Sequence, residues 1–162
     1  MKYLTRKIWT GELSEYETDK RLREYINDQS ASERSSEIRN FRKTESLHDG
    51  RIQRVKKMDR LVVLDILGGD LQSGYKKYGL KFVGDPVAFC PLIEPNSSLA
   101  MWSEEILAEE FLAQRSRLVF NLIFHQAGEI SIEYDVFSWT CEPSSREDYE
   151  ALRVKPPRLE IG

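Results

Sequence analysis

Two neighbouring stretches decide the fold: LVFNLIF at residues 118–124 and EISIEYDVF at residues 129–137. The first is continuously apolar apart from Asn121. The second alternates, with Ile130, Ile132, Tyr134 and Val136 separated by Ser131, Glu133 and Asp135. Alternation with a period of two predicts a strand with one packed and one solvated face. The short connection Gln126-Ala127-Gly128 favours pairing of the two as a β-hairpin.

Further strands are predicted upstream of this hairpin. Residues 61–67 (LVVLDIL) are short, rich in β-branched residues and followed by two glycines, which is typical of a central strand. Ile52 and Val55 predict a strand before it, and residues 78–84 one after it. Three prolines make residues 85–98 a loop or at most an edge strand. Residues 99–112 fit either a short helix or a strand.

The N-terminal part has a different pattern. Residues 3–9 predict a strand, and a helix is expected over residues 14–28, with Tyr16, Leu22 and Ile26 on one stripe. A second helix, about residues 32–43, has only Ile38 and Phe41 as candidates for burial. The chain is therefore predicted to be an α+β protein, an antiparallel β-sheet meander with an N-terminal helical arm. We expect one domain over 1–162, with the arm at 14–44, the sheet core at 46–141 and an extended tail at 142–162.

Composition and charge narrow the class of protein. With 40% hydrophobic and 31% charged residues the chain is globular. It shows no signal peptide and no apolar run that could span a bilayer, so a cytoplasmic protein with Cys90 and Cys141 reduced is expected. The formal net charge of −3 is distributed as +1 over residues 1–45, +4 over 46–84 and −8 over 85–162. The scattered basic residues argue against a nucleic-acid partner.

Histidine chemistry has two candidate positions. His48 and Asp49 could hold a metal in a metal-dependent hydrolase, but the favoured interpretation is a turn. In that turn Asp49 accepts backbone N–H groups and Gly50 supplies an unusual dihedral angle. His125 is expected at a strand rim. A zinc site built from Cys90, Cys141, His48 and His125 is disfavoured, because no two of them show paired ligand spacing. We predict no catalytic residues and no cofactor.

Carboxylates dominate the second half. An acidic patch for a basic protein partner is predicted, with Trp102 as a candidate interface anchor. Its members are Glu104, Glu105, Glu109, Glu110, Glu129, Glu133 and Asp135. For Glu104, Glu105, Glu109 and Glu110 the helical spacing favours a simple solvated face over a functional role. A third possibility is a homodimer or larger homo-oligomer joined through an exposed sheet edge.

The opening MKYLT with Trp9, and the segment LHDGRI at residues 47–52, resemble a group of uncharacterised bacterial proteins with a His-Asp-x-x-Ile strand opening. Similar sheet domains occur among the immunity proteins of bacterial polymorphic toxin systems. The resemblance implies a cytoplasmic protein that acts by binding, and it brings no catalytic residues. We therefore expect an immunity-type protein that neutralises a toxin, or regulates a partner, by occluding its functional surface. The alternatives are the hydrolase using His48 and Asp49 and the homo-oligomeric structural protein.

Overall fold

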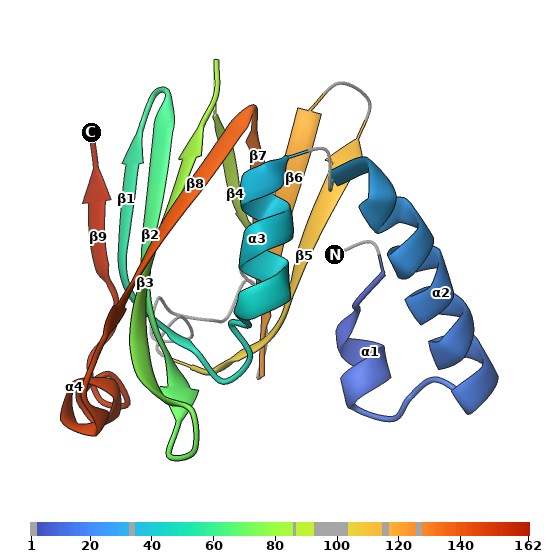
Figure 1. Ribbon diagram of the computed structural model, residues 1–162, viewed down its shortest axis with the longest axis horizontal. Helices are drawn as coiled ribbons and strands as arrows, with labels where there is room; N and C mark the ends of the chain where they lie inside the picture. Colours follow the sequence, from blue (N-terminus) through green and yellow to red (C-terminus); the bar gives the residue numbers. More distant parts are fainter. Residues whose placement is uncertain (1–2, 33–34, 86, 93–103, 115–116, 126–127) are drawn as a thin grey trace.

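The computed structural model describes residues 3–32, 35–85, 87–92, 104–114, 117–125 and 128–162. Its strands form two sheets (Figure 1). The first has the spatial order β8 (Val136–Pro143), β3 (Gly74–Val83), β2 (Leu61–Asp70), β1 (Arg51–Met58), β9 (Arg158–Ile161). The second has the order β4 (Ala88–Leu92), β7 (Glu129–Tyr134), β6 (Arg117–Phe124), β5 (Ile106–Gln114). With helices at the N-terminus, this architecture confirms the α+β prediction.

The predicted meander is present as β1, β2 and β3, which pair antiparallel in chain order. The predicted hairpin is β6 and β7, with Phe120 opposite Ile132. The strand predicted over 129–137 breaks at Asp135, however. Its first part stays beside β6 in the second sheet, whereas β8 enters the first sheet beside β3. One chain segment therefore joins the two sheets.

The main core lies between the sheets. Inward-facing side chains from both contribute to it, among them Leu64, Phe82 and Phe137 from the first sheet and Phe111 and Phe120 from the second. The ring centroids of Phe82 and Phe120 are 4.9 Å apart, and those of Phe111 and Phe137 are 5.2 Å apart. These contacts across the layers show that the sheets pack face to face, as in a sandwich.

Helix α3 (Ser36–Thr44) packs against the open side of this sandwich, next to β8 (Figure 1). The Ser35 side chain accepts the backbone N–H of Ile38, which caps the first turn. Ile38 and Phe41 are fully buried, as predicted from their spacing. Phe41 reaches Trp139 of β8 and Phe111 of β5 at centroid distances of 5.2 and 5.7 Å. The helix thus bridges the edges of the two sheets.

The N-terminal arm covers the outer face of β5. The strand predicted over 3–9 is wrong, because residues Arg6–Trp9 form the short helix α1. The predicted second element is confirmed as α2 (Glu15–Ser32). Its expected apolar stripe is not buried: Ile26 is 64% exposed, and Tyr25 packs against the sheet instead. The rings of Tyr25 and Tyr3 lie 6.0 Å apart between centroids and belong to one apolar cluster over β5.

Two more predictions are settled by the strands. The proline-rich segment supplies β4, which is an edge strand, and β5 shows that residues 106–112 are a strand and not a helix. The segment 142–162 is more than an extended tail. It holds α4 (Arg146–Ala151), which begins at the Ser145 cap, and β9, which pairs parallel with β1. Among the described residues no helix is long and apolar enough to cross a membrane.

Candidate functional site

The predicted acidic patch loses two of its members, Glu109 and Glu110, and β5 explains why. Successive residues of a strand point to opposite sides. Glu110 points toward the arm and is fully buried, where Oε1 accepts the backbone N–H groups of Tyr3, at 2.8 Å, and Leu4. Its Oε2 accepts the Asn121 amide at 3.2 Å. The expectation of a solvated face is therefore wrong for Glu110, which is a structural acceptor.

Glu109 points the other way, toward the segment that follows α3. It accepts the Leu47 backbone N–H at 3.3 Å. Burial raises the pKa of Glu109, because removing a carboxylate from water disfavours its charged form. Like Glu110, this side chain is poorly placed to meet a partner.

The other predicted acids lie in separate places. Glu129 and Glu133 are on the outer face of β7, where the solvated side of the hairpin was predicted. Asp135 lies between β7 and β8 and pairs with Arg117 at 3.3 Å. Glu104 precedes β5. Trp102 falls outside the described residues. These acids are thus distributed over the start of β5, the outer face of β7 and the segment between β7 and β8.

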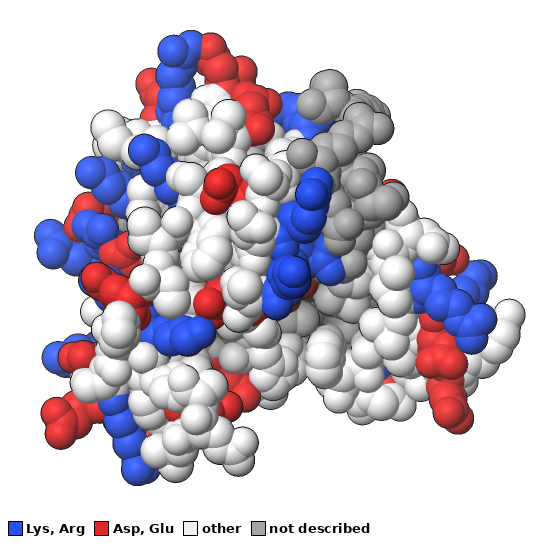
Figure 2. All heavy atoms as spheres, in the orientation of Figure 1, with Lys and Arg blue, Asp and Glu red and all other residues white. Residues whose placement is uncertain are grey.

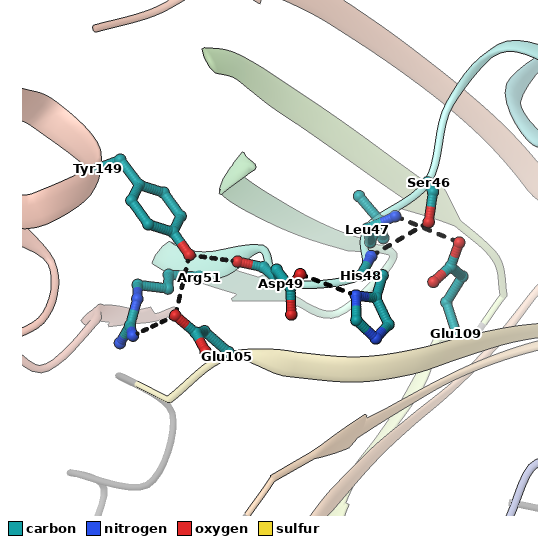
Figure 3. Close-up of polar contacts among 8 residues, drawn as sticks. All are labelled: Ser46, Leu47, His48, Asp49, Arg51, Glu105, Glu109 and Tyr149. Atoms are coloured by element: carbon teal, nitrogen blue, oxygen red, sulfur yellow. Dashed lines mark hydrogen bonds and ion pairs between the residues drawn. The ribbon is translucent and has the colours of Figure 1, made fainter. Parts of the chain in front are cut away.

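The segment between α3 and β1 forms the predicted turn at His48 and Asp49 (Figure 3). Its detail differs from the prediction, because Asp49 and not Gly50 adopts the positive φ, +62°. Gly50 is required for another reason: a Cβ there would lie 2.8 Å from the Leu47 carbonyl oxygen. The Asp49 carboxylate lies close to the His48 imidazole, with 3.0 Å between Oδ2 and Nδ1. Aspartate is one of the few residues besides glycine that adopt this conformation, and neighbouring contacts hold it there.

Those contacts come from β5 and from α4. The Asp49 N–H donates to the Ile106 carbonyl at 2.9 Å, and the Ile106 N–H donates to the Gly50 carbonyl at 2.7 Å. The Tyr149 hydroxyl of α4 donates to the Asp49 carbonyl (Figure 3). The turn is thereby fixed to the start of β5.

Glu105 lies next to the turn. It binds Arg51 at 2.7 Å and the Tyr149 hydroxyl at 3.2 Å, in both cases through Oε1. Burial alone would raise the pKa of Glu105, but the Arg51 guanidinium outweighs it and, with the Tyr149 hydroxyl, lowers that pKa. The carboxylate is therefore ionised at neutral pH.

His125 completes this neighbourhood from the end of β6. Its backbone N–H donates to the Glu105 carbonyl at 3.3 Å. Side-chain ligand atoms of Asp49, Glu105 and His125 all lie within 4.8 Å of one another. The sequence analysis considered His48, Asp49 and His125 but did not associate Glu105 with them. The pairing of β5 with β6 brings Glu105 and His125 together. The two residues are 20 positions apart in the sequence, and no known ligand motif has this spacing, so the sequence analysis could not associate them.

A second surface lies on the outer face of the first sheet. Met58, Leu61, Val83 and Val136 are consecutive neighbours across β1, β2, β3 and β8. The adjacent row consists of Lys56, Val63, Lys81 and Ser138. We call these eight residues the outer-face patch. Helix α4 packs on the far end of β2, against Leu67 and away from the patch. Charged side chains of both signs are interspersed over the side of the molecule that holds β9 and β1 (Figure 2).

No protein-family model, curated protein or solved structure matches this chain. The resemblance to immunity proteins therefore stays a prediction, and the function has to be argued from the two surfaces described above.

Proposed function

We propose that this chain is a cytoplasmic protein-binding module of the immunity type, which neutralises a toxin or regulates a partner by covering that partner's functional surface. The observation that carries the proposal is the outer-face patch. It places four aliphatic side chains in one row across four strands, and Met58 and Val136 at its ends are 44% and 59% exposed. A contiguous apolar row with a polar border is typical of interaction surfaces.

The border of the patch supplies the polar part. Lys56 and Lys81 each lie opposite Val63, one on either side of it. Within the described part of the chain neither lysine forms an ion pair. Charged groups at the rim of an interface act mainly on the rate and specificity of association. The partner that fits is therefore one with an apolar centre and with acidic groups opposite Lys56 and Lys81.

A small hollow adjoins the row. It has a volume of about 240 Å³ and is lined by Val83, Val136, Gly84 and the charged residues Arg60, Asp85 and Asp135. A hollow of this size accepts one side chain of a partner. Interface energy concentrates where an anchor side chain fills such a pocket. Val136 is thus the position whose change should affect binding most.

The test uses Val136 with Ile26 as its matched control. Both are exposed aliphatic residues, but Ile26 lies on α2, on the second sheet's side of the molecule. A photo-crosslinking amino acid is placed at each position in cells, and the partner protein that becomes linked to position 136 is identified and purified. The Kd of the complex between this partner and each of three chains (wild type, V136D and I26D) is then measured.

We expect V136D to weaken binding of that purified protein at least tenfold, about 1.4 kcal/mol, and I26D to leave it unchanged. Equal affinities for all three chains, or crosslinking through position 26 alone, would contradict the proposal. A second copy of this chain linked through position 136 is a separate outcome. Sedimentation velocity would then show a dimer that V136D dissociates, which would favour the homo-oligomer alternative instead.

A further inference from the structure

We infer that Asp49, Glu105 and His125 bind one Zn²⁺ ion. The three residues come from the turn before β1, the residue before β5 and the residue after β6. The site does not share residues with the outer-face patch, so it stands independently of the proposed function. The sequence analysis considered a metal held by His48 and Asp49. The ligand set proposed here keeps Asp49 but does not include His48.

The geometry brings together three side chains that are far apart in the sequence. Their ligand atoms lie within 4.8 Å of one another. Tetrahedral zinc with bonds of about 2.0–2.2 Å needs ligand atoms roughly 3.4 Å apart. Side-chain rotations on the order of an ångström would close that difference. Backbone hydrogen bonds join Asp49 to Ile106 and His125 to Glu105, and they hold the three segments next to one another.

The donor set determines the kind of ion. One imidazole nitrogen and two carboxylates suit zinc and neighbouring transition metals, whereas Mg²⁺ and Ca²⁺ prefer oxygen ligands only. Three protein ligands leave a position open for water, as in catalytic zinc sites. A structural zinc site would instead be closed by four protein ligands.

Outer contacts orient both carboxylates. His48 Nδ1 lies 3.0 Å from Asp49 Oδ2. Arg51 and Tyr149 both bind Oε1 of Glu105, so we assign Oε2 as the ligand atom of this carboxylate. Partners of this kind fix the ligand geometry in metal sites. His48 is therefore a positioning residue here, and not a ligand as the hydrolase alternative had it.

Two clefts lie beside Asp49. One, of about 300 Å³, is lined by His48, Asp49 and Lys76 among others. The other, of about 510 Å³, is lined by Asp49, Glu105, Tyr149 and Arg153 among others. Asp49 lines both clefts and Glu105 lines the larger one, so water or a small anionic ligand could approach the two carboxylates from the larger cleft.

The experiment is calorimetric titration of the full chain with Zn²⁺ in a buffer that does not chelate metals. The variants are D49N, which keeps a side chain tolerated at positive φ, and H125Q. The control is E150Q, because Glu150 lines the larger cleft but is not one of the three ligands. Circular dichroism of each variant verifies that the fold is retained.

We expect the wild-type chain to bind one Zn²⁺ with a Kd of about 1 μM or below, which is roughly −8 kcal/mol. D49N and H125Q should weaken binding at least tenfold, E150Q should not change it, and Mg²⁺ should not compete. Absence of saturable 1:1 binding by the wild-type chain would overturn the inference. Binding by D49N and H125Q at the wild-type affinity would overturn it equally, because the zinc would then be held elsewhere.

Discussion

Replacing Glu110 by alanine should detach the N-terminal arm. The substitution removes the acceptor of the Tyr3 and Leu4 backbone N–H groups and of the Asn121 amide, all of them buried. Hydrogen bonds to a charged group contribute about 1.5–3 kcal/mol each, and removing one partner also leaves buried donors unsatisfied. We therefore expect E110A to lower the free energy of unfolding by roughly 3–5 kcal/mol.

The conservative change E110Q is informative because both backbone N–H groups bind the same oxygen. A glutamine can still present one carbonyl oxygen to Tyr3 and Leu4, but its NH₂ group would meet the Asn121 NH₂ group. The loss should be smaller, about 1–2 kcal/mol. The control is E133A on the exposed outer face of β7, which should stay within about 0.5 kcal/mol of wild type.

Two assays would check this. Urea denaturation gives the free energy of unfolding, and limited proteolysis reports whether the chain between α1 and α2 becomes accessible. If E110A costs less than about 1 kcal/mol and the arm resists protease as in wild type, then Glu110 does not hold the arm and the reasoning fails.

Three further predictions concern the buried groups Glu109 and Tyr149 and the closely packed backbone at Gly50. Burial raises the pKa of Glu109 above its ordinary value of 4.5, so the folded chain holds the proton to a higher pH than the unfolded chain does. E109Q should therefore be more stable than wild type at pH 7. The difference in free energy of unfolding, measured by urea titration, should shrink toward pH 4. Burial also raises the pKa of Tyr149 from 10.0 to about 12. Stability should therefore fall as the pH rises from 10 to 12, and an absorbance titration at 295 nm should show Y149F losing a late-titrating tyrosine. Finally, G50A puts a Cβ 2.8 Å from the Leu47 carbonyl oxygen and should lower Tm by several degrees, a cost of about 2 kcal/mol; an unchanged melting curve would show that the turn is free to shift.

Much of the fold could be predicted because its signals are local. The alternation over residues 129–134 and the β-branched run at 61–67 specify strands by themselves, and Ile38 and Phe41 mark the buried side of α3. The arm was harder to predict. Residues 3–9 read as a strand by composition, but Tyr3 and Leu4 pack on β5 and their backbone N–H groups bind Glu110, which lies more than 100 positions away.

The candidate sites were less predictable for the same reason. Glu109 and Glu110 look like a solvated pair until β5 places them on opposite sides of a strand. His125 and Glu105 meet only through the pairing of β5 with β6, and the outer-face patch exists only through the register of four strands. Charge counts along the chain could not find it, since they pointed to the acidic second half instead.

The most direct test of the proposed function is a footprint of lysine reactivity inside cells that produce the protein. Acetylation rates of Lys56 and Lys81 on the outer-face patch are compared with the rate of Lys20 on α2, first in cells and then in the purified chain at low concentration. Protection of Lys56 and Lys81 by several-fold in cells, with Lys20 unchanged, is the predicted result. Equal rates in cells and in the purified chain at all three lysines would mean that nothing covers this face, and the binding-module account would be wrong.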